Sequence, residues 1–258
     1  GAWCGWCVDG TYKLEQILEE FPGRVIPVKL HNGDAMVPPV QGEIASGLGL
    51  TGYPAGCIDR KKFNGSAFPD RISGSDYSVN AWTPLVEGQL DAPAKIDIRL
   101  LYTLDPSTRE LKATISALML ETLASDLTFN VYIIEDSCSG IGTGWDQHNY
   151  LNGRAGWEFN PYYNLPDLIT NYYHRFVVRD LLGGAWGVTG EFTNPAESGS
   201  EYSHEFTTTL NPSWNLDRIQ IVASISDKNT KEVINCCYGS TKPPALEIAS
   251  LSPELGAV

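Results

Sequence analysis

Apolar positions in the first third of the chain alternate between helical spacing and short β-rich runs. Residues 5–21 carry apolar side chains three and four positions apart, which predicts a helix that Pro22 ends. Residues 25–30 predict a short strand, a second short helix follows Pro39, and residues 54–58 predict another strand. This order of helix, strand, helix and strand predicts an α/β fold for the first third of the chain.

A third helix is predicted over residues 76–90, where Ser75 or Asp76 is the N-cap and the apolar positions again follow helical spacing. An Asp-Ala-Pro sequence breaks the pattern directly after this helix. We therefore expect two domains, one over residues 1–92 and one over residues 93–258.

Beyond this boundary the hydrophobic period changes to two. Ile96, Ile98 and Leu100 alternate with charged residues, which predicts a half-buried strand. Several runs of the same kind follow, separated by turns such as residues 227–230. Short strands joined by turns predict an antiparallel β-sandwich. The further runs are residues 111–121, 127–134, 205–210, 218–226 and 231–237.

Residues 137–202 interrupt this series as a long insertion that is rich in Gly, Asn, Tyr and Trp. The insertion is too long for a plain loop. We expect a short helix near residues 165–182, on which His174 is a packed structural histidine. The aromatic residues predict either a core private to the insertion, which we favour, or a surface for a carbohydrate or a protein partner.

Composition and charge narrow the class of protein. Of the 258 residues, 42% are hydrophobic and 19% are charged, a balance typical of a folded chain rather than a disordered one. The net charge of −13 repels phosphate backbones and argues against nucleic-acid binding. No apolar run approaches the roughly 20 residues of a membrane-spanning helix, so we expect no transmembrane segment.

The six cysteines do not predict a metal centre. No histidine lies at metal-ligand spacing from a cysteine pair, so we expect no metal and no cofactor. Cys57 is expected to be a buried strand cysteine, with a third redox thiol as the alternative. Cys138 and the pair Cys236-Cys237 end strands of the same predicted domain, and we expect a disulfide between Cys138 and one of these two.

The sequence Trp3-Cys4-Gly5-Trp6-Cys7 opens the first predicted helix. Unpaired N–H groups and the helix dipole at this end stabilise a thiolate. Cys4 is then the exposed attacking thiol and Cys7 the resolving thiol of a thiol–disulfide oxidoreductase. The alternative is a closed structural disulfide between the same two cysteines. Trp6 either faces a substrate or shields the bond, and shielding is slightly favoured.

The C-x-x-C motif, the order of elements and the sequence Gly52-Tyr53-Pro54 together resemble a thioredoxin-like fold. The resemblance implies that Pro54 is cis and lies against the disulfide, and that Trp6, Tyr53 and Pro54 contact a bound peptide. It also implies a central strand before the motif. Gly1 stands only three residues before Cys4, so we expect that strand to come from upstream sequence or from a neighbouring chain by β-strand addition.

Further motifs resemble the outer-membrane-protein-28-related family, which comprises exported thioredoxin-like proteins, mostly of Bacteroidetes-type bacteria. The resemblance implies an extracellular or outer-membrane location and covers nearly the whole chain. The matching segments include Ile58-Asp59-Arg60, Ile134-Glu135-Asp136, Gln147-His148-Asn149-Tyr150, Tyr173-His174-Arg175, Gly184-Ala185-Trp186-Gly187 and Glu232-Val233-Ile234-Asn235.

Two functions remain open from the sequence. The favoured one is a cell-surface interaction or structural protein on a thioredoxin-like scaffold, which binds a protein partner or assembles with itself through sheet edges. The alternative is an exported oxidoreductase that uses the Cys4–Cys7 pair. The sandwich and its insertion occupy about two thirds of the chain, more than a redox carrier needs, and this favours the first.

Overall fold

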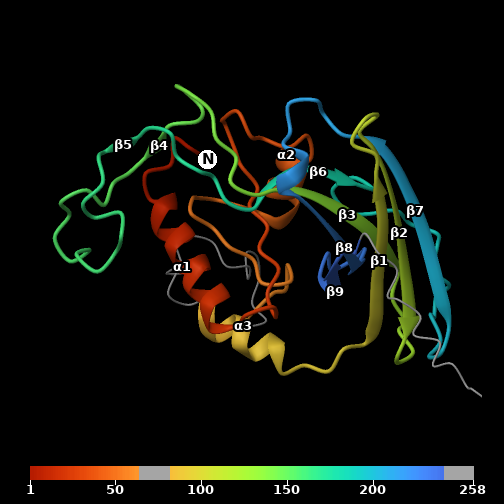
Figure 1. Ribbon diagram of the computed structural model, residues 1–258. Helices are drawn as coiled ribbons and strands as arrows, with labels where there is room; N and C mark the ends of the chain where they lie inside the picture. The colour runs from red at the N-terminus through yellow and green to blue at the C-terminus, as the bar shows by residue number, and fades with distance from the viewer. Residues whose placement is uncertain (64–81, 241–258) are drawn as a thin grey trace, which may run out of the picture.

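The strand β3 (Leu127–Glu135) shows how the molecule is layered, because all nine of its residues are buried. Successive side chains of a strand point to opposite faces, so both faces of the sheet are covered at this strand. In the computed structural model, which describes residues 1–63 and 82–240, a second sheet covers one face and the N-terminal helices cover the other (Figure 1).

The chain forms helices first and antiparallel strands afterwards. One sheet has the order β1-β2-β7, the middle sheet has the order β6-β3-β8-β9, and β4 pairs with β5. The helices are α1 (Cys7–Glu20), α2 (Gln41–Leu48) and α3 (Trp82–Leu90). The other strands are β1 (Ile96–Leu104), β2 (Glu110–Met119), β4 (Gln147–His148), β5 (Leu168–Ile169), β6 (Val177–Leu182), β7 (Glu201–Thr209), β8 (Ile219–Asp227) and β9 (Val233–Tyr238).

The main core lies between the two larger sheets. In β2, buried and more exposed residues alternate along the whole strand, so one face points inward. This face packs against Phe129, Val131 and Ile133 of β3 and against β8. The period-two pattern of the sequence therefore predicted these strands, and the sheets are antiparallel as expected.

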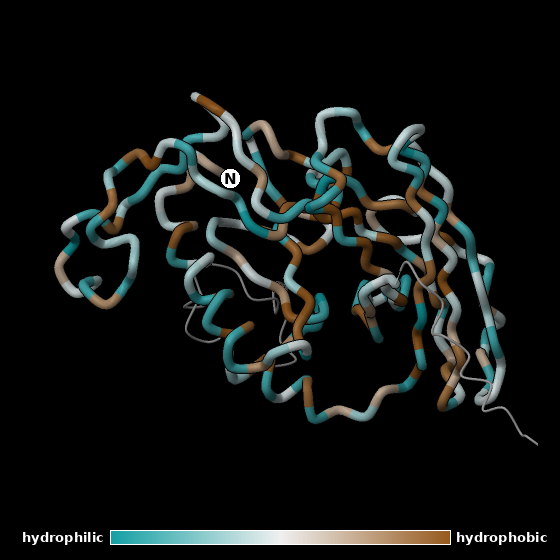
Figure 2. Tube along the Cα trace, in the orientation of Figure 1, coloured by the Kyte–Doolittle hydropathy of each residue, from teal (hydrophilic) through white to brown (hydrophobic). Residues whose placement is uncertain are grey.

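A second core lies on the opposite face of the middle sheet. Tyr132, Ile134 and Val178 pack there against Ile44 of α2, with Leu14 of α1 at the margin. Figure 2 shows hydrophobic segments gathered at the centre of the molecule, where the helices meet this sheet. The N-terminal helices are thus packed onto the middle sheet by apolar contacts.

The two strands predicted in the first third are not formed. Residues 25–30 touch the middle sheet at one point, where the Lys29 amide donates to the carbonyl of Phe176 at 2.8 Å and the Val178 amide donates to the carbonyl of Lys29 at 3.0 Å. Residues 54–58 join no sheet, and the chain turns directly after them. A strand needs a partner beside it, and in the described part of the chain neither segment has one over its length.

Two helix predictions also change. α3 is described from Trp82, and the predicted N-caps Ser75 and Asp76 lie outside the described residues. The helix predicted near 165–182 is wrong, because that segment forms β5 and β6. β6 pairs with β3 through a bulge and is covered on both faces, so its apolar residues do not alternate. The segment Val177–Leu182 of the predicted insertion therefore belongs to the middle sheet.

Neighbouring residues of β3 test the layered arrangement. Ile133 faces the sandwich and Ile134 faces the helices, and both are fully buried. We expect Ile133→Ala and Ile134→Ala each to lower the free energy of unfolding by about 2–5 kcal/mol in urea titrations. Leu101→Ala, at a side chain that is 45% exposed, is the control and should change it by less than about 0.5 kcal/mol. A near-neutral Ile134→Ala would contradict the packing of the helices.

Candidate functional site

The Cys4–Cys7 disulfide stands at the start of α1, with its Cα atoms 5.4 Å apart. The turn before the helix is closed by two backbone bonds: the Cys4 amide donates to the carbonyl of Gly1, and the Cys7 amide donates to that of Cys4, both at 3.0 Å. Thr11, one turn on, donates its hydroxyl to the Cys7 carbonyl at 3.1 Å. Both cysteines therefore lie at the positive end of the helix dipole, as the sequence predicts.

Cys4 is not the exposed thiol that the sequence predicts, because the residue is only 4% exposed. Cys7 is half-buried. The residues around Cys4 are bound by the insertion: the His148 amide donates to the Ala2 carbonyl at 2.8 Å, and the Gln147 side-chain amide donates to the Cys4 carbonyl at 3.0 Å. We call residues 147–157 the cap.

The cap also covers the two residues between the cysteines. The Tyr150 amide donates to the carbonyl of Gly5 at 3.0 Å, and the Tyr150 ring lies where a Cβ on Gly5 would be. Trp6 contacts Tyr150 and Trp157 with ring centroids 6.1 and 5.7 Å apart, and the Arg154 guanidinium lies 4.6 Å from the Trp6 ring centroid. Trp6 is thus engaged by the cap on this side.

The Tyr53–Pro54 peptide bond is cis, as the sequence analysis expects. Pro54 lies against α1, because a Cβ placed on Gly10 would stand 3.0 Å from the Pro54 Cβ. The Tyr53 ring meets the Trp3 ring edge to face at 5.5 Å. The structure therefore brings Tyr53 and Pro54 to the same end of α1 as the disulfide.

A buried polar cluster that the sequence analysis did not single out supports this end of the chain. Asp34 accepts bonds from the Ala2 amide and His31 Nδ1, both at 2.7 Å, and from the Met36 amide at 2.9 Å. Burial disfavours the Asp34 carboxylate, but these bonds outweigh it and hold the pKa of Asp34 below its usual value. In the sequence, residues 31–34 (His-Asn-Gly-Asp) indicate a turn, which does not reveal the buried partners of Asp34.

His174 lies beside this cluster, and its ring meets that of His31 at 5.1 Å. Its Nε2 donates to the Trp145 carbonyl at 2.8 Å, and burial lowers the pKa of His174 to about 3. Its backbone forms two bonds with Cys138, at 2.8 and 2.9 Å. The imidazole is therefore a neutral, packed side chain that holds the insertion in place.

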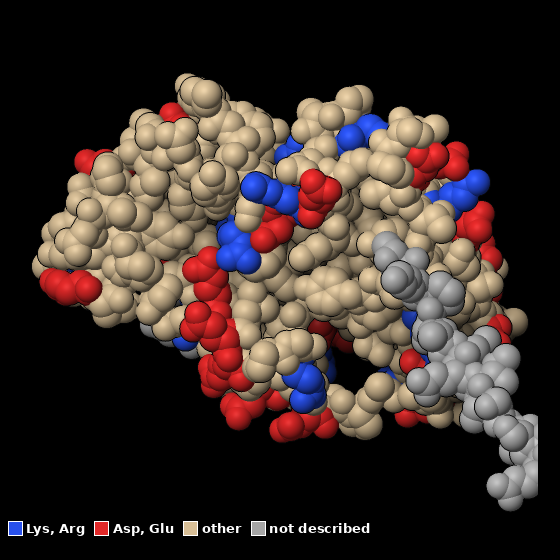
Figure 3. All heavy atoms as spheres, in the orientation of Figure 1, with Lys and Arg blue, Asp and Glu red and all other residues tan. Residues whose placement is uncertain are grey.

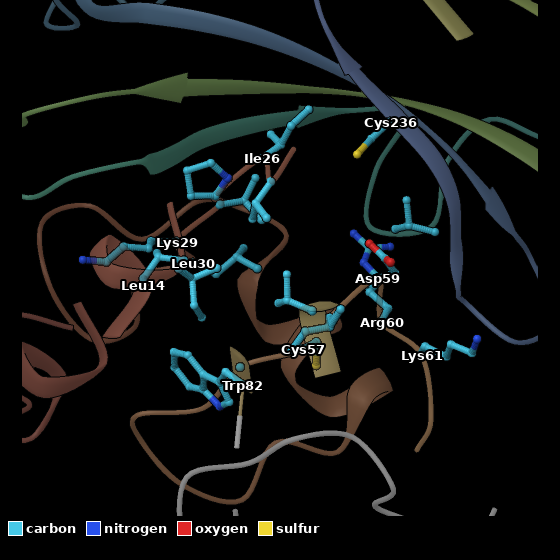
Figure 4. Close-up of a pocket in the computed structure, with 18 of the residues that line it drawn as sticks. Leu14, Ile26, Lys29, Leu30, Cys57, Asp59, Arg60, Lys61, Trp82 and Cys236 are labelled. Atoms are coloured by element: carbon cyan, nitrogen blue, oxygen red, sulfur yellow. The ribbon is translucent and has the colours of Figure 1, made fainter. Parts of the chain in front are cut away.

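A cavity of about 970 Å³ adjoins the disulfide on its inner side and is lined by Cys7, Tyr53 and Pro54 among others. Figure 4 shows Leu14 and Leu30 on one side of it with Lys29 next to them, and Asp59, Arg60 and Lys61 on the other side. Residues 25–30 and 54–58, the two segments of the first third that were predicted to be strands, both line this cavity. Burial there lowers the pKa of Lys29 to about 8.

The expected bridge from Cys138 to Cys236 or Cys237 is not formed. Cys236 pairs with Ser224, which lies opposite Asn130 of β3, whereas Cys138 follows the far end of that strand. The five residue-to-residue steps from Asn130 to Glu135 alone span about 16 Å, and a disulfide needs Cα atoms within about 7 Å.

Cys57 is also placed differently from the expectation, because it is exposed rather than buried. Burial raises the pKa of Cys138 and of Cys236 to about 12, and that of Cys237 to about 11. These three thiols are therefore poor nucleophiles. Among the residues in the described ranges, no group of three or more His, Cys, Asp or Glu side chains is arranged to hold a metal ion.

The thiols give a direct test of this placement. We expect iodoacetamide to label Cys57 first in the native protein, because it is exposed, and to label Cys138, Cys236 and Cys237 only after unfolding. Mass spectrometry of the labelled peptides would measure the order, with labelling in guanidinium chloride as the control. Labelling of Cys138 as fast as Cys57 in the native protein would show that the placement is wrong.

The low pKa of His174 gives a second prediction. The unfolded chain binds a proton at this imidazole below about pH 6.5 and the folded chain does not, so stability is lost as the pH falls below that value. Between pH 7 and pH 5 this group should lower the free energy of unfolding by about 2 kcal/mol. His174→Gln should remove that part of the difference in urea titrations, and an unchanged pH dependence would contradict it.

Three comparisons bear on identity, and no curated protein matches the chain. A solved domain of the outer membrane lipoprotein Omp28 from Porphyromonas gingivalis is 21% identical, and the match covers 57% of this chain and 89% of that chain with a TM-score of 0.30. No helix within residues 1–63 and 82–240 has the length and apolar character to cross a membrane. Residues 42–238 match the family described as outer membrane protein Omp28. That match spans more than half of the chain and indicates a location at the outer-membrane surface, as the motifs of the sequence predict. The protein therefore belongs to the outer membrane protein Omp28 family.

Proposed function

We propose that this exported protein is a surface interaction protein whose N-terminal part, residues 1–92, is a thioredoxin-like scaffold for the β-rich part, residues 93–258. In this proposal the Cys4–Cys7 disulfide is structural. The observation that carries it is the burial of Cys4, which is 4% exposed beneath a cap that bonds to the residues around it. A redox carrier must present its attacking sulfur to a partner, and here the cap occupies the position beside Cys4 that a partner would need.

Local features support the thioredoxin-like scaffold. A C-x-x-C disulfide begins α1, and a cis-proline lies beside the same helix. The helices of this part pack on the middle sheet of the β-rich part, which gives the scaffold a fixed position against it. One part of such a scaffold is not formed by these segments: residues 25–30 and 54–58 were expected to be strands, and neither is a strand of a sheet.

Sheet edges support a protein partner or self-assembly. β6 is partly covered by Lys29, and residue Ser240 links the end of β9 to β1 by two backbone bonds of 3.1 and 3.3 Å. Within the described residues β7 pairs only with β2, so its outer edge presents unpaired backbone groups (Figure 1). Such an edge accepts a strand from another chain, and Glu201 and Glu205 on β7 select against acidic partners.

The alternative function, thiol–disulfide exchange, is favoured by a different observation. Cys7 is half-buried, lies at the first position of α1, and lines the cavity together with the cis-proline. A thiolate at this position is stabilised by the helix dipole. The two functions differ in whether the resting protein exchanges its disulfide with a substrate.

An insulin-reduction assay separates them. We expect the wild-type protein to show no activity above the dithiothreitol background, because the cap covers Cys4, and Cys4→Ser to behave in the same way. Thioredoxin in the same assay is the positive control. Wild-type activity that disappears in Cys4→Ser would instead establish the oxidoreductase.

A further inference from the structure

The contact between the cap and the disulfide turn has the form of a bound peptide. The amides of His148 and Tyr150 donate to the carbonyls of Ala2 and Gly5, so alternate residues of an extended segment pair with the turn. The side chain of Gln147 adds the bond to the Cys4 carbonyl. Main-chain pairing of this kind is how folded domains hold extended peptides.

The aromatic contacts complete this arrangement. Gly5 has no side chain and admits the Tyr150 ring, while Trp6 is held between Trp157, Tyr150 and the Arg154 guanidinium. The side chains that meet Trp6 are nevertheless open to solvent: Tyr150 is 54% exposed and Arg154 is exposed, although Leu151 of the cap is fully buried. The cap therefore rests on the turn from outside.

We propose that the cap is an intramolecular inhibitor of thiol–disulfide exchange at Cys4–Cys7, and that opening the cap makes the disulfide reducible. This goes beyond the structural role proposed for the resting protein. In the open form a thiolate of a dithiol attacks one sulfur of the disulfide, the Cys4–Cys7 bond breaks, and the electron pair leaves on the other sulfur, which takes a proton from water. The second thiol of the reagent, as a thiolate, then attacks the reagent sulfur of the mixed disulfide so formed. The reagent leaves as its cyclic disulfide, and the protein sulfur leaves as a thiolate that takes up a proton.

Coupling between cap and disulfide follows from the same contacts. The disulfide fixes the turn whose three carbonyls the cap binds, so the cap binds the oxidised turn better than the reduced one. Such coupling is reciprocal. The factor by which reduction weakens the binding of the cap to the turn must therefore equal the factor by which opening the cap favours reduction of the disulfide.

The rate of reduction by excess dithiothreitol tests the inhibition. We expect Tyr150→Ala and Trp157→Ala each to be reduced about tenfold faster than the wild-type protein, because each loses aromatic contacts that hold the cap closed. Tyr173→Ala is the matched control, since this tyrosine lies in the same insertion, is 57% exposed and makes no described contact with the motif. Its rate should equal the wild-type rate.

The outcome that overturns the proposal is equally plain. Cap variants that are reduced at the wild-type rate would show that the cap does not limit attack on the disulfide, and would leave the cavity beside Cys7 as the route for the thiol. Circular dichroism of each variant would establish that it is folded.

A second measurement needs no variant. Hydrogen exchange of the His148 and Tyr150 amides should speed up about tenfold when the wild-type disulfide is reduced, while the Val222 amide in β8 stays protected. Equal exchange of the cap amides in both redox states would refute the coupling. This result is independent of the insulin assay, which reports only on the resting protein.

Discussion

The burial of β3 on both faces is the constraint on which the rest of the structure depends. A strand with nine buried residues is stable only if each face of its sheet is covered. The three-stranded sheet covers one face by packing on Phe129 and Ile133, and the N-terminal helices cover the other by packing on Tyr132 and Ile134. The helical layer is therefore needed by the sheet, and the disulfide motif is held at the end of a helix whose position this packing sets.

The elements that the sequence predicted best are those whose structure is determined by residues near to them in the chain. β1 and β2 bury one face, so their alternation is visible in the residues themselves. α1 and α2 follow helical spacing and end where Pro22 and Gly49 require it. β6 was misread as a helix because it is covered on both faces and contains a bulge, so no period of two remains. Residues 25–30 were wrongly predicted to be a strand because their composition suits one, whereas strand formation also requires a neighbouring strand to pair with.

The same distinction explains the candidate site. The position of Cys4 and Cys7 at a helix start follows from nearby residues, and the cis state of Pro54 was implied by the resemblance to a thioredoxin-like fold; both were foreseen. The burial of Cys4 was not, because the cap that covers it is about 140 residues away in the sequence. Asp34 was missed as well, since its role rests on buried hydrogen bonds to the Ala2 amide and other groups that no spacing reveals.

The cap can open without unfolding the sheet only if the root of the insertion is held separately from residues 147–157. The structure provides such an attachment. Cys138 and His174 form two backbone bonds at the root of the insertion, and His174 Nε2 is bonded to Trp145, just before the cap. The cap itself is held by the contacts of Tyr150 and Arg154 with the Trp6 ring, by its bonds to the disulfide turn and by the buried Leu151 side chain. Figure 3 shows acidic side chains in a row along α1, whereas the lobe that contains the cap carries few charges on this face. Among the described residues no salt bridge includes a cap residue. The stability of the closed form therefore depends on the turn that the disulfide fixes.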